Sequence, residues 1–142
     1  MLQYKKILAP VDFAEISNSA LRQAASHSEQ SQSELLVAHV VDWVLPNYAS
    51  ESMVSAMDSE KTLVRQAELH LEYLLDELEI GYCEKIVRTG KTIPALLDII
   101  TESEVDLVVM GTQRCAPASE RYKSVTMAII ENADCDVLVL HK

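Results

Sequence analysis

Two kinds of hydrophobic pattern alternate along this chain of 142 residues. Five short runs are rich in β-branched and other apolar residues, and two of them, DLVVM and DVLVL, are almost wholly apolar. Such continuous runs are typical of parallel strands that are covered on both faces. The predicted strands are Tyr4–Val11, Leu35–Val41, Cys83–Arg88, Asp106–Met110 and Asp136–His141.

The segments between these strands carry helical spacing. From Asp58 to Glu79 the apolar residues recur with a period close to that of an α-helix, which predicts a long amphipathic helix. Ser17–Glu29 is rich in alanine and periodic in the same way. Two more helices are predicted, one capped by Thr92 and continuing to Thr101, and one from about Ser124 to Asn132.

Strands and helices therefore alternate from one end of the chain to the other. This order predicts an α/β fold, in which an open parallel sheet with right-handed crossovers carries helices on both faces. The sheet and its helices form a single domain over residues 1–142. One connection is unusually long, because Trp43–Met57, with Pro46 and several serines, is predicted to be a loop before the second helix.

Charge and cysteine content narrow the classes of function. The 12 basic and 22 acidic residues give a net charge of −10, which argues against binding to nucleic acids or anionic membranes. The three cysteines, Cys83, Cys115 and Cys135, are spread out without a C-x-x-C motif, which fits a reducing cytosol. The four histidines lack metal-ligand spacing. The apolar N-terminal stretch stops at Asp12, too early for a signal peptide. We therefore expect a cytoplasmic protein without a bound metal.

The end of the first strand is one candidate wall of a ligand site. In open doubly wound sheets, ligands bind beyond the carboxyl ends of the strands, where the strand order reverses. The first strand ends at Pro10-Val11-Asp12, beside that position. The Asp12 carboxylate can accept hydrogen bonds from a ribose or from an adenine amino group. It can equally cap the turn into the first helix.

The end of the fourth strand supplies a second candidate wall. It ends at Met110-Gly111, and the following loop reaches the predicted fourth helix at about Ser124-Val125-Thr126. Unpaired N–H groups and hydroxyls at the start of a helix can bind an anion. The simpler interpretation is that Ser124 caps the helix.

Gly90-Lys91-Thr92 matches the end of a phosphate-binding P-loop. The first glycine of that motif would fall at Lys85, so the match fails. This segment is interpreted as a turn followed by a helix cap.

Four separated blocks of the sequence resemble the universal stress protein family. They are YKKILAPVDFAEIS, LLVAHVVD, DLVVMGT and SVTMAIIENADCDVLVL, which cover nearly the whole chain in the family's order. The resemblance implies a Rossmann-like fold of the adenine nucleotide alpha hydrolase type, with five parallel strands in the order 3-2-1-4-5. In that order the switch point lies between the first and fourth strands.

The family resemblance also points to a degraded phosphate-binding loop. Members that bind ATP carry G-x2-G-x9-G-[ST] after the fourth strand. This chain keeps Gly111 but has Arg114 in the second glycine position, and either Lys123 or Ser124 in the third. Glycines there let backbone amides approach the phosphates, so their loss implies weak or absent ATP binding. The cations Arg114, Arg121 and Lys123 could partly replace the lost amides.

The adenine and ribose end of the family site is matched at Asp12, Val41 and Met110. The candidate ligands are ATP, with Mg²⁺, and AMP, and the pattern requires no cofactor. The nucleotide-binding residues that the resemblance implies are Pro10, Val11, Asp12, Val41, Met110, Gly111, Arg114, Ser124, Val125 and Thr126.

The last strand, Asp136–His141, would be an edge strand of apolar β-formers. The family resemblance implies a homodimer in which this strand pairs with its partner's last strand across a two-fold axis and covers the edge. The alternative is that a short strand ending in Lys142 is protection enough. The predicted interface residues are Val137, Leu138, Val139 and Leu140.

Three functions compete at this point. The first is a non-enzymatic stress-response protein that acts as a homodimer on protein partners. The second is a nucleotide sensor that binds ATP or AMP. The third is an enzyme such as an ATPase, but the sequence offers no nucleophile–histidine pair and no convincing base near Asp12 and Gly111. We therefore expect no catalytic residues, and Cys115 has no histidine near it in sequence.

Overall fold

The computed structural model describes residues 3–42, 50–112 and 119–141, and within them residues 50–57 and 119–124 by their backbone alone. Five strands and four helices alternate along the chain. The strands are β1 (Lys6–Pro10), β2 (Glu34–Val41), β3 (Glu84–Thr89), β4 (Leu107–Thr112) and β5 (Asp136–His141). The helices are α1 (Glu15–Ser31), α2 (Ser50–Glu77), α3 (Thr92–Glu102) and α4 (Ser119–Asn132).

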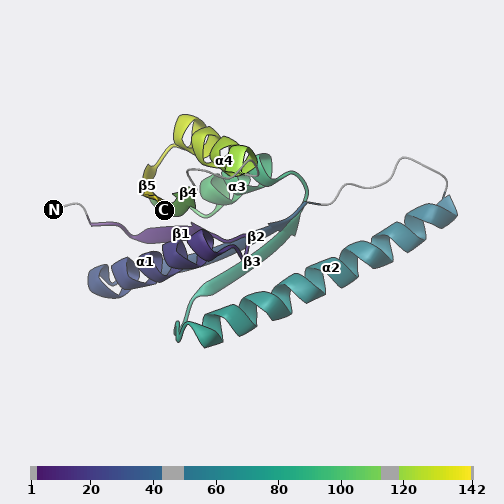
Figure 1. Ribbon diagram of the computed structural model, residues 1–142, viewed down its shortest axis with the longest axis horizontal. Coiled ribbons are helices and arrows are strands. Elements are labelled where there is room, and N and C mark those ends of the chain that lie inside the picture. Colours follow the sequence, from purple (N-terminus) through teal and green to yellow (C-terminus); the bar gives the residue numbers. More distant parts are fainter. Residues whose placement is uncertain (1–2, 43–49, 113–118, 142) are drawn as a thin grey trace.

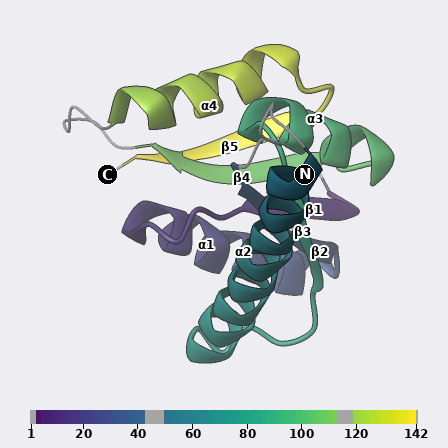
Figure 2. The ribbon, with the colours of Figure 1, turned by 90° about the vertical axis from the view of Figure 1, so that its right-hand side faces the viewer.

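The five strands form one parallel sheet in the order β3-β2-β1-β4-β5, as expected. Helices α1 and α2 cover one face of the sheet, and α3 and α4 cover the other (Figures 1 and 2). The fold class and the strand order predicted from the sequence are therefore confirmed. Each predicted strand lies within two residues of the observed one, because continuous apolar runs mark strands that are buried from both sides.

Two helix boundaries were predicted wrongly. Helix α2 begins at Ser50 and not at Asp58, so most of the loop predicted over Trp43–Met57 is helical, and only 43–49 lies outside the described residues. The segment SESMVSAM contains no glycine or proline and includes Ala, Met and Glu, which favour a helix more than its serines oppose one. Helix α4 begins at Ser119 and not near Ser124.

The start of α3 also differs in detail from the prediction. Its N-cap is Lys91, in an extended conformation with φ −78° and ψ 135°, and Thr92 is the first helical residue. Thr92 therefore does not cap the helix. The turn before it was predicted correctly, because Gly90 has a φ of 126°, which L side chains rarely adopt.

The core has two halves, one on each side of the sheet. Period-two alternation along β1 places Ile7 and Ala9 toward α1 and α2, and Leu8 toward α3 and α4. All six residues of β4 are buried, whereas β5 has partly exposed residues along its length because it is an edge strand. The apolar run in β5 is thus less covered than its composition suggested. No helix within the described ranges is long and apolar enough to cross a membrane.

A polar cluster fixes the N-terminal ends of three strands. The Asp106 carboxylate accepts hydrogen bonds from the backbone N–H groups of Lys5, at 2.8 Å, and Lys6, at 3.0 Å. The Tyr4 hydroxyl donates to Oδ2 of Asp136 at 2.9 Å. This hydrogen bond, together with burial and the charges of Asp136 and Asp106, raises the pKa of Tyr4 above its ordinary value of about 10.

We predict that Asp136→Asn lowers the pKa of Tyr4 toward the ordinary value, because the amide keeps an acceptor but removes the charge. The folded pKa lies above the unfolded one, so the stabilisation is complete below about pH 10 and is lost as the pH rises through the folded pKa. An NMR titration of ring-labelled tyrosines, with Tyr4→Phe to assign the signal, measures the shift. An unchanged Tyr4 titration in Asp136→Asn would contradict the assigned cause.

Candidate functional site

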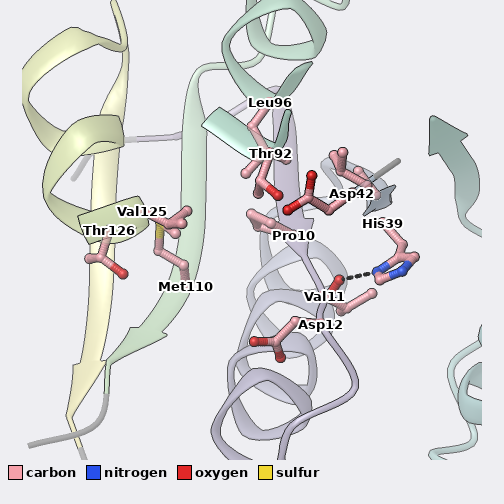
Figure 3. Close-up of a pocket in the computed structure, with 12 residues that line it drawn as sticks. Pro10, Val11, Asp12, His39, Asp42, Thr92, Leu96, Met110, Val125 and Thr126 are labelled. Atoms are coloured by element: carbon pink, nitrogen blue, oxygen red, sulfur yellow. Dashed lines mark hydrogen bonds between the residues drawn. The ribbon is translucent and has the colours of Figure 1, made fainter. Parts of the chain in front are cut away.

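A cavity of about 390 Å³ lies at the carboxyl ends of β1, β2 and β4, where the strand order reverses. Residues from α3 and α4 close its other side (Figure 3). Its volume falls in the range of small-ligand sites, which is roughly 300–1,000 Å³. It is lined by Pro10, Val11, Asp12, Ala38, His39, Val40, Asp42, Thr92, Leu96, Met110, Val125 and Thr126.

The segment that follows β1 is held in place by hydrogen bonds to β2 and α1. The Val11 N–H donates to the Ala38 carbonyl at 2.8 Å, and Nδ1 of His39 donates to the Val11 carbonyl at 2.7 Å. A carbonyl can only accept, so this contact places the proton of the ring on Nδ1. His39 thus uses Nδ1 to hold the segment after β1 against β2.

Asp12 has the turn-capping role that the sequence offered, and it also lines the cavity. Its Oδ1 accepts a hydrogen bond from the Ala14 N–H at 2.9 Å, and its own N–H donates to the buried Ser17 Oγ at 3.0 Å. These two bonds form the turn into α1. Asp12 is also exposed and lines the cavity, so its carboxylate is accessible to a ligand.

The next residue, Phe13, ties this turn to helix α2. Its backbone has a φ of 67°, a left-handed conformation that non-glycine residues seldom adopt. The Phe13 ring stacks on the ring of His70 in α2, with centroids 3.9 Å apart and planes 10° from parallel. It also contacts the His39 ring at 4.6 Å. Two aromatic contacts therefore stabilise a conformation that costs energy by itself.

The opposite wall differs from the expected phosphate site. Ser124-Val125-Thr126 lies inside α4, after more than one helical turn, and not at its N-terminus. Backbone N–H groups at such positions bond to the carbonyls four residues earlier, so they are not available to an anion. The Thr126 hydroxyl donates to the Gly111 carbonyl at 3.3 Å. The predicted role of this segment as a helix start is therefore wrong.

Gly111 is required by packing. A Cβ built on it would lie 2.4 Å from Cγ1 of Ile16 and 3.1 Å from the Ile16 carbonyl oxygen. Ile16 is buried in α1, so α1 crosses β4 at a distance that only glycine permits. Gly111 does not line the cavity.

The cavity brings together six of the ten predicted binding residues: Pro10, Val11, Asp12, Met110, Val125 and Thr126. Val41 was predicted to line the cavity, but its neighbour Val40 does so instead. Alternation along β2 places successive side chains on opposite faces of the sheet. The Val41 carbonyl accepts a hydrogen bond from the Gly90 N–H at 3.0 Å. Arg114 lies outside the described residues, and Ser124 is described by its backbone alone.

The sequence reasoning missed the rest of the lining, which is Ala38, His39, Val40, Asp42, Thr92 and Leu96. The alternating pattern of β2 would have identified Ala38 and Val40, because both share a face with the buried Leu36. Thr92 belongs to the segment that was interpreted as a turn and a cap. It reaches the cavity because α3 starts beside the carboxyl end of β2 (Figure 3).

The lining is apolar on most sides and acidic at two points. Asp12 and Asp42 contribute carboxylates, and none of the described lining residues is a lysine or an arginine. Over the described part of the chain, no group of three or more His, Cys, Asp or Glu side chains could hold a metal ion. Cys83 and Cys135 are not among the lining residues, and burial is the main cause that raises the pKa of each thiol.

The fold defines a doubly wound α/β protein with a cavity at the switch point of its sheet. The sequence profile of the universal stress protein family matches residues 3–141, and the chain belongs to this family. Universal stress protein A homolog 2 of Coxiella burnetii is 25% identical over 141 residues, which cover 99% of this chain and 97% of that protein. Universal stress protein MJ0577 of Methanocaldococcus jannaschii is 26% identical, with coverage of 99% and 97%.

Solved structures agree with this assignment. The structure of MJ0577 has a TM-score of 0.77 at 25% identity and covers 99% of this chain and 98% of its own. Universal stress protein UspA from Lactobacillus plantarum has a TM-score of 0.73 at 21% identity, with 99% of both chains covered. Three further family structures, at 19%, 18% and 16% identity, are complexes with cAMP, dAMP and AMP respectively.

We predict that Gly111→Ala lowers the free energy of unfolding by about 1–3 kcal/mol, because the added methyl overpacks the contact with Ile16. Gly81→Ala is the matched control, since a Cβ there meets nothing within 4 Å, and it should change stability by less than about 0.5 kcal/mol. Urea unfolding of both variants measures the difference. Equal stability of the two would show that α1 can retreat from β4 without cost.

Proposed function

We propose that this universal stress protein is a non-enzymatic, cytoplasmic stress-response protein that acts as a homodimer. Its cavity binds the adenosine part of an adenine nucleotide, and it holds a triphosphate weakly or not at all. It acts on its pathway through protein partners.

The observation that carries this proposal is the unbroken helix α4. The helix begins at Ser119 and runs through position 123, where the ATP-binding pattern of the family places its last glycine. Lysine and arginine favour a helix and glycine opposes one, so residues 119–123 are helical where a glycine loop would expose its amides. The N–H groups of residues 124–126 are used within the helix, which removes a phosphate cradle.

The proposed binding of adenosine is supported by the residues that line the cavity and by related structures. Apolar side chains of Val40, Leu96 and Met110 line the cavity beside the Asp12 carboxylate. An apolar slot with a few placed polar groups suits a base and a ribose. The family structures in complex with cAMP, dAMP and AMP support a ligand that contains adenosine.

The absence of enzymatic activity is supported by the chemistry of the described side chains. The one histidine that lines the cavity, His39, has Nδ1 bonded to the Val11 carbonyl. Catalytic cysteines act as thiolates, and the raised pKa values of Cys83 and Cys135 hold both thiols protonated at neutral pH. Neither cysteine lines the cavity.

Dimerisation is supported by the position of β5. This strand pairs with β4 on one side, and the order of the sheet leaves its other side at the edge. Its residues from Val137 to Leu140 are only partly buried in the monomer. A two-fold axis along this edge would pair β5 with the β5 of a second subunit.

A second candidate function is a sensor of AMP or ATP. The family structures with bound nucleotides favour it, and the cationic residues Arg114, Arg121 and Lys123 would supply the phosphate contacts. Nucleotide titration separates the two functions.

We predict that ATP with Mg²⁺ binds no more tightly than AMP, because the β- and γ-phosphates find no amide cradle. Isothermal titration of nucleotide-stripped protein with each ligand measures both affinities. Micromolar ATP binding at least tenfold tighter than AMP would instead favour the sensor, with side-chain cations in place of the glycines. In that event Arg114→Ala should reduce the ATP affinity.

We predict a solution mass of twice 15.8 kDa by light scattering. Leu138→Pro should return the mass to that of a monomer, because proline disrupts pairing at this edge. Lys85→Pro, on the opposite edge strand β3, is the control and should leave the dimer intact. Circular dichroism verifies the fold of each variant. A folded Leu138→Pro protein that stays dimeric would place the interface elsewhere.

A further inference from the structure

Three aromatic rings from separate elements meet beside the turn that carries Asp12. Phe13 follows Asp12 in the chain, His39 belongs to β2, and His70 belongs to α2. The ring centroids of Phe13 and His70 are 3.9 Å apart, and those of Phe13 and His39 are 4.6 Å apart. Asp12 lines the cavity, whereas none of the described lining residues belongs to α2. The cluster therefore joins a residue that a ligand can reach to a helix outside the described lining.

The conformation of Phe13 decides where the Asp12 carboxylate lies. The hydrogen bond from the Ala14 N–H to Oδ1 of Asp12, at 2.9 Å, closes a turn around Phe13. This turn needs the Phe13 φ of 67°, which lies in the left-handed region that a side chain with a Cβ opposes. A Phe13 that relaxed to a negative φ would carry the Ala14 N–H away from Asp12 and release the carboxylate from its place in the lining.

We propose that Phe13 is a positioning residue for the adenosine cavity, and that its stack on His70 couples the affinity of the cavity to helix α2. The inference rests on the proposed adenosine site and goes beyond it, because it assigns control of that site to residues outside the lining. The strain at Phe13 and the stacking that offsets it are of the same order. Loss of the stack therefore lets a substantial fraction of molecules leave the ligand-competent conformation, and the apparent affinity falls with the competent fraction.

His70 is the member of the cluster that can be changed without touching the cavity. It is exposed on α2, so its ring adds little to the buried core. Alanine at this position keeps the helix and removes only the ring. His39 is unsuitable for the same test, because its ring lines the cavity and donates to the Val11 carbonyl (Figure 3).

The first measurement is calorimetric titration of the full-length protein with AMP. His70→Ala should weaken AMP binding about twofold to tenfold, which is the fold-change that corresponds to one aromatic pair. His70→Phe should restore the affinity of the unaltered protein, because a phenyl ring can stack on Phe13 in the same way. Tyr73→Ala is the matched control, since it removes a ring that is 66% exposed on the same helix, and it should leave the affinity unchanged.

The second measurement needs no ligand. Amide hydrogen exchange followed by NMR reports on the Ala14 N–H, which is bonded to Asp12, and on the Asp12 N–H, which is bonded to Ser17 at 3.0 Å. Both should exchange about twofold to tenfold faster in His70→Ala and at the original rate in His70→Phe. The amides of the buried strand β4 should keep their rates in every variant, which separates a loosened turn from a loss of global stability.

Equal AMP affinity of the unaltered protein and His70→Ala would overturn the coupling to α2 and leave the adenosine site of the proposed function standing. Failure of His70→Phe to restore the affinity, or an equal loss in Tyr73→Ala, would show that the stack is not the cause and would overturn the coupling as well. Unchanged exchange at Asp12 and Ala14 in His70→Ala would overturn the positioning role even if the affinity fell. No AMP binding by the folded, unaltered protein would overturn the adenosine site and the coupling together.

Discussion

The parallel pairing of β1 with β2 on one side and β4 on the other is the constraint on which the rest of this molecule depends. Parallel strands bring their carboxyl ends to the same edge of a sheet, and here that edge brings together Asp12 after β1, Asp42 after β2 and Met110 near the end of β4. The connection after β1 runs toward β2, and β4 lies on the other side of β1, so a crevice opens at the carboxyl end of β1 where the strand order reverses. The position of the cavity therefore follows from the order in which the strands are connected, whatever side chains line it.

The fold could be predicted almost completely from the sequence, because each buried strand is marked by the composition of its own residues. Parallel strands that are buried on both faces must be apolar throughout, and Leu107–Met110 carries that signal without ambiguity. The starts of α2 and α4 could not be located in the same way. Before α2, serines and a proline suggested irregular structure, and before α4 a resemblance to a glycine loop did so. In both places helix-forming residues in fact continue the helix.

The predicted part of the candidate site consists of residues at or just after the ends of β1 and β4, together with Val125 and Thr126 of α4. Asp12 and Met110 were identified because the chain must emerge from β1 and β4 at the switch point. Thr92 and Leu96 belong to α3, and their arrival at the cavity depends on the packing of that helix on the sheet. The sequence predicted Val41 as a lining residue, whereas the structure has Val40 in the lining. A shift of one residue in a strand moves a side chain to the other face of the sheet.

The contact between Gly111 and Ile16 bears on how the sequences of related proteins are interpreted. The glycine that begins the ATP motif is held in this chain by the crossing of α1 over β4, where any larger residue collides with a buried side chain. Packing alone is enough to require this glycine, whether or not a ligand binds. In this chain the first glycine of the motif is therefore a sign of close helix–strand packing, and by itself it does not indicate that a nucleotide is bound.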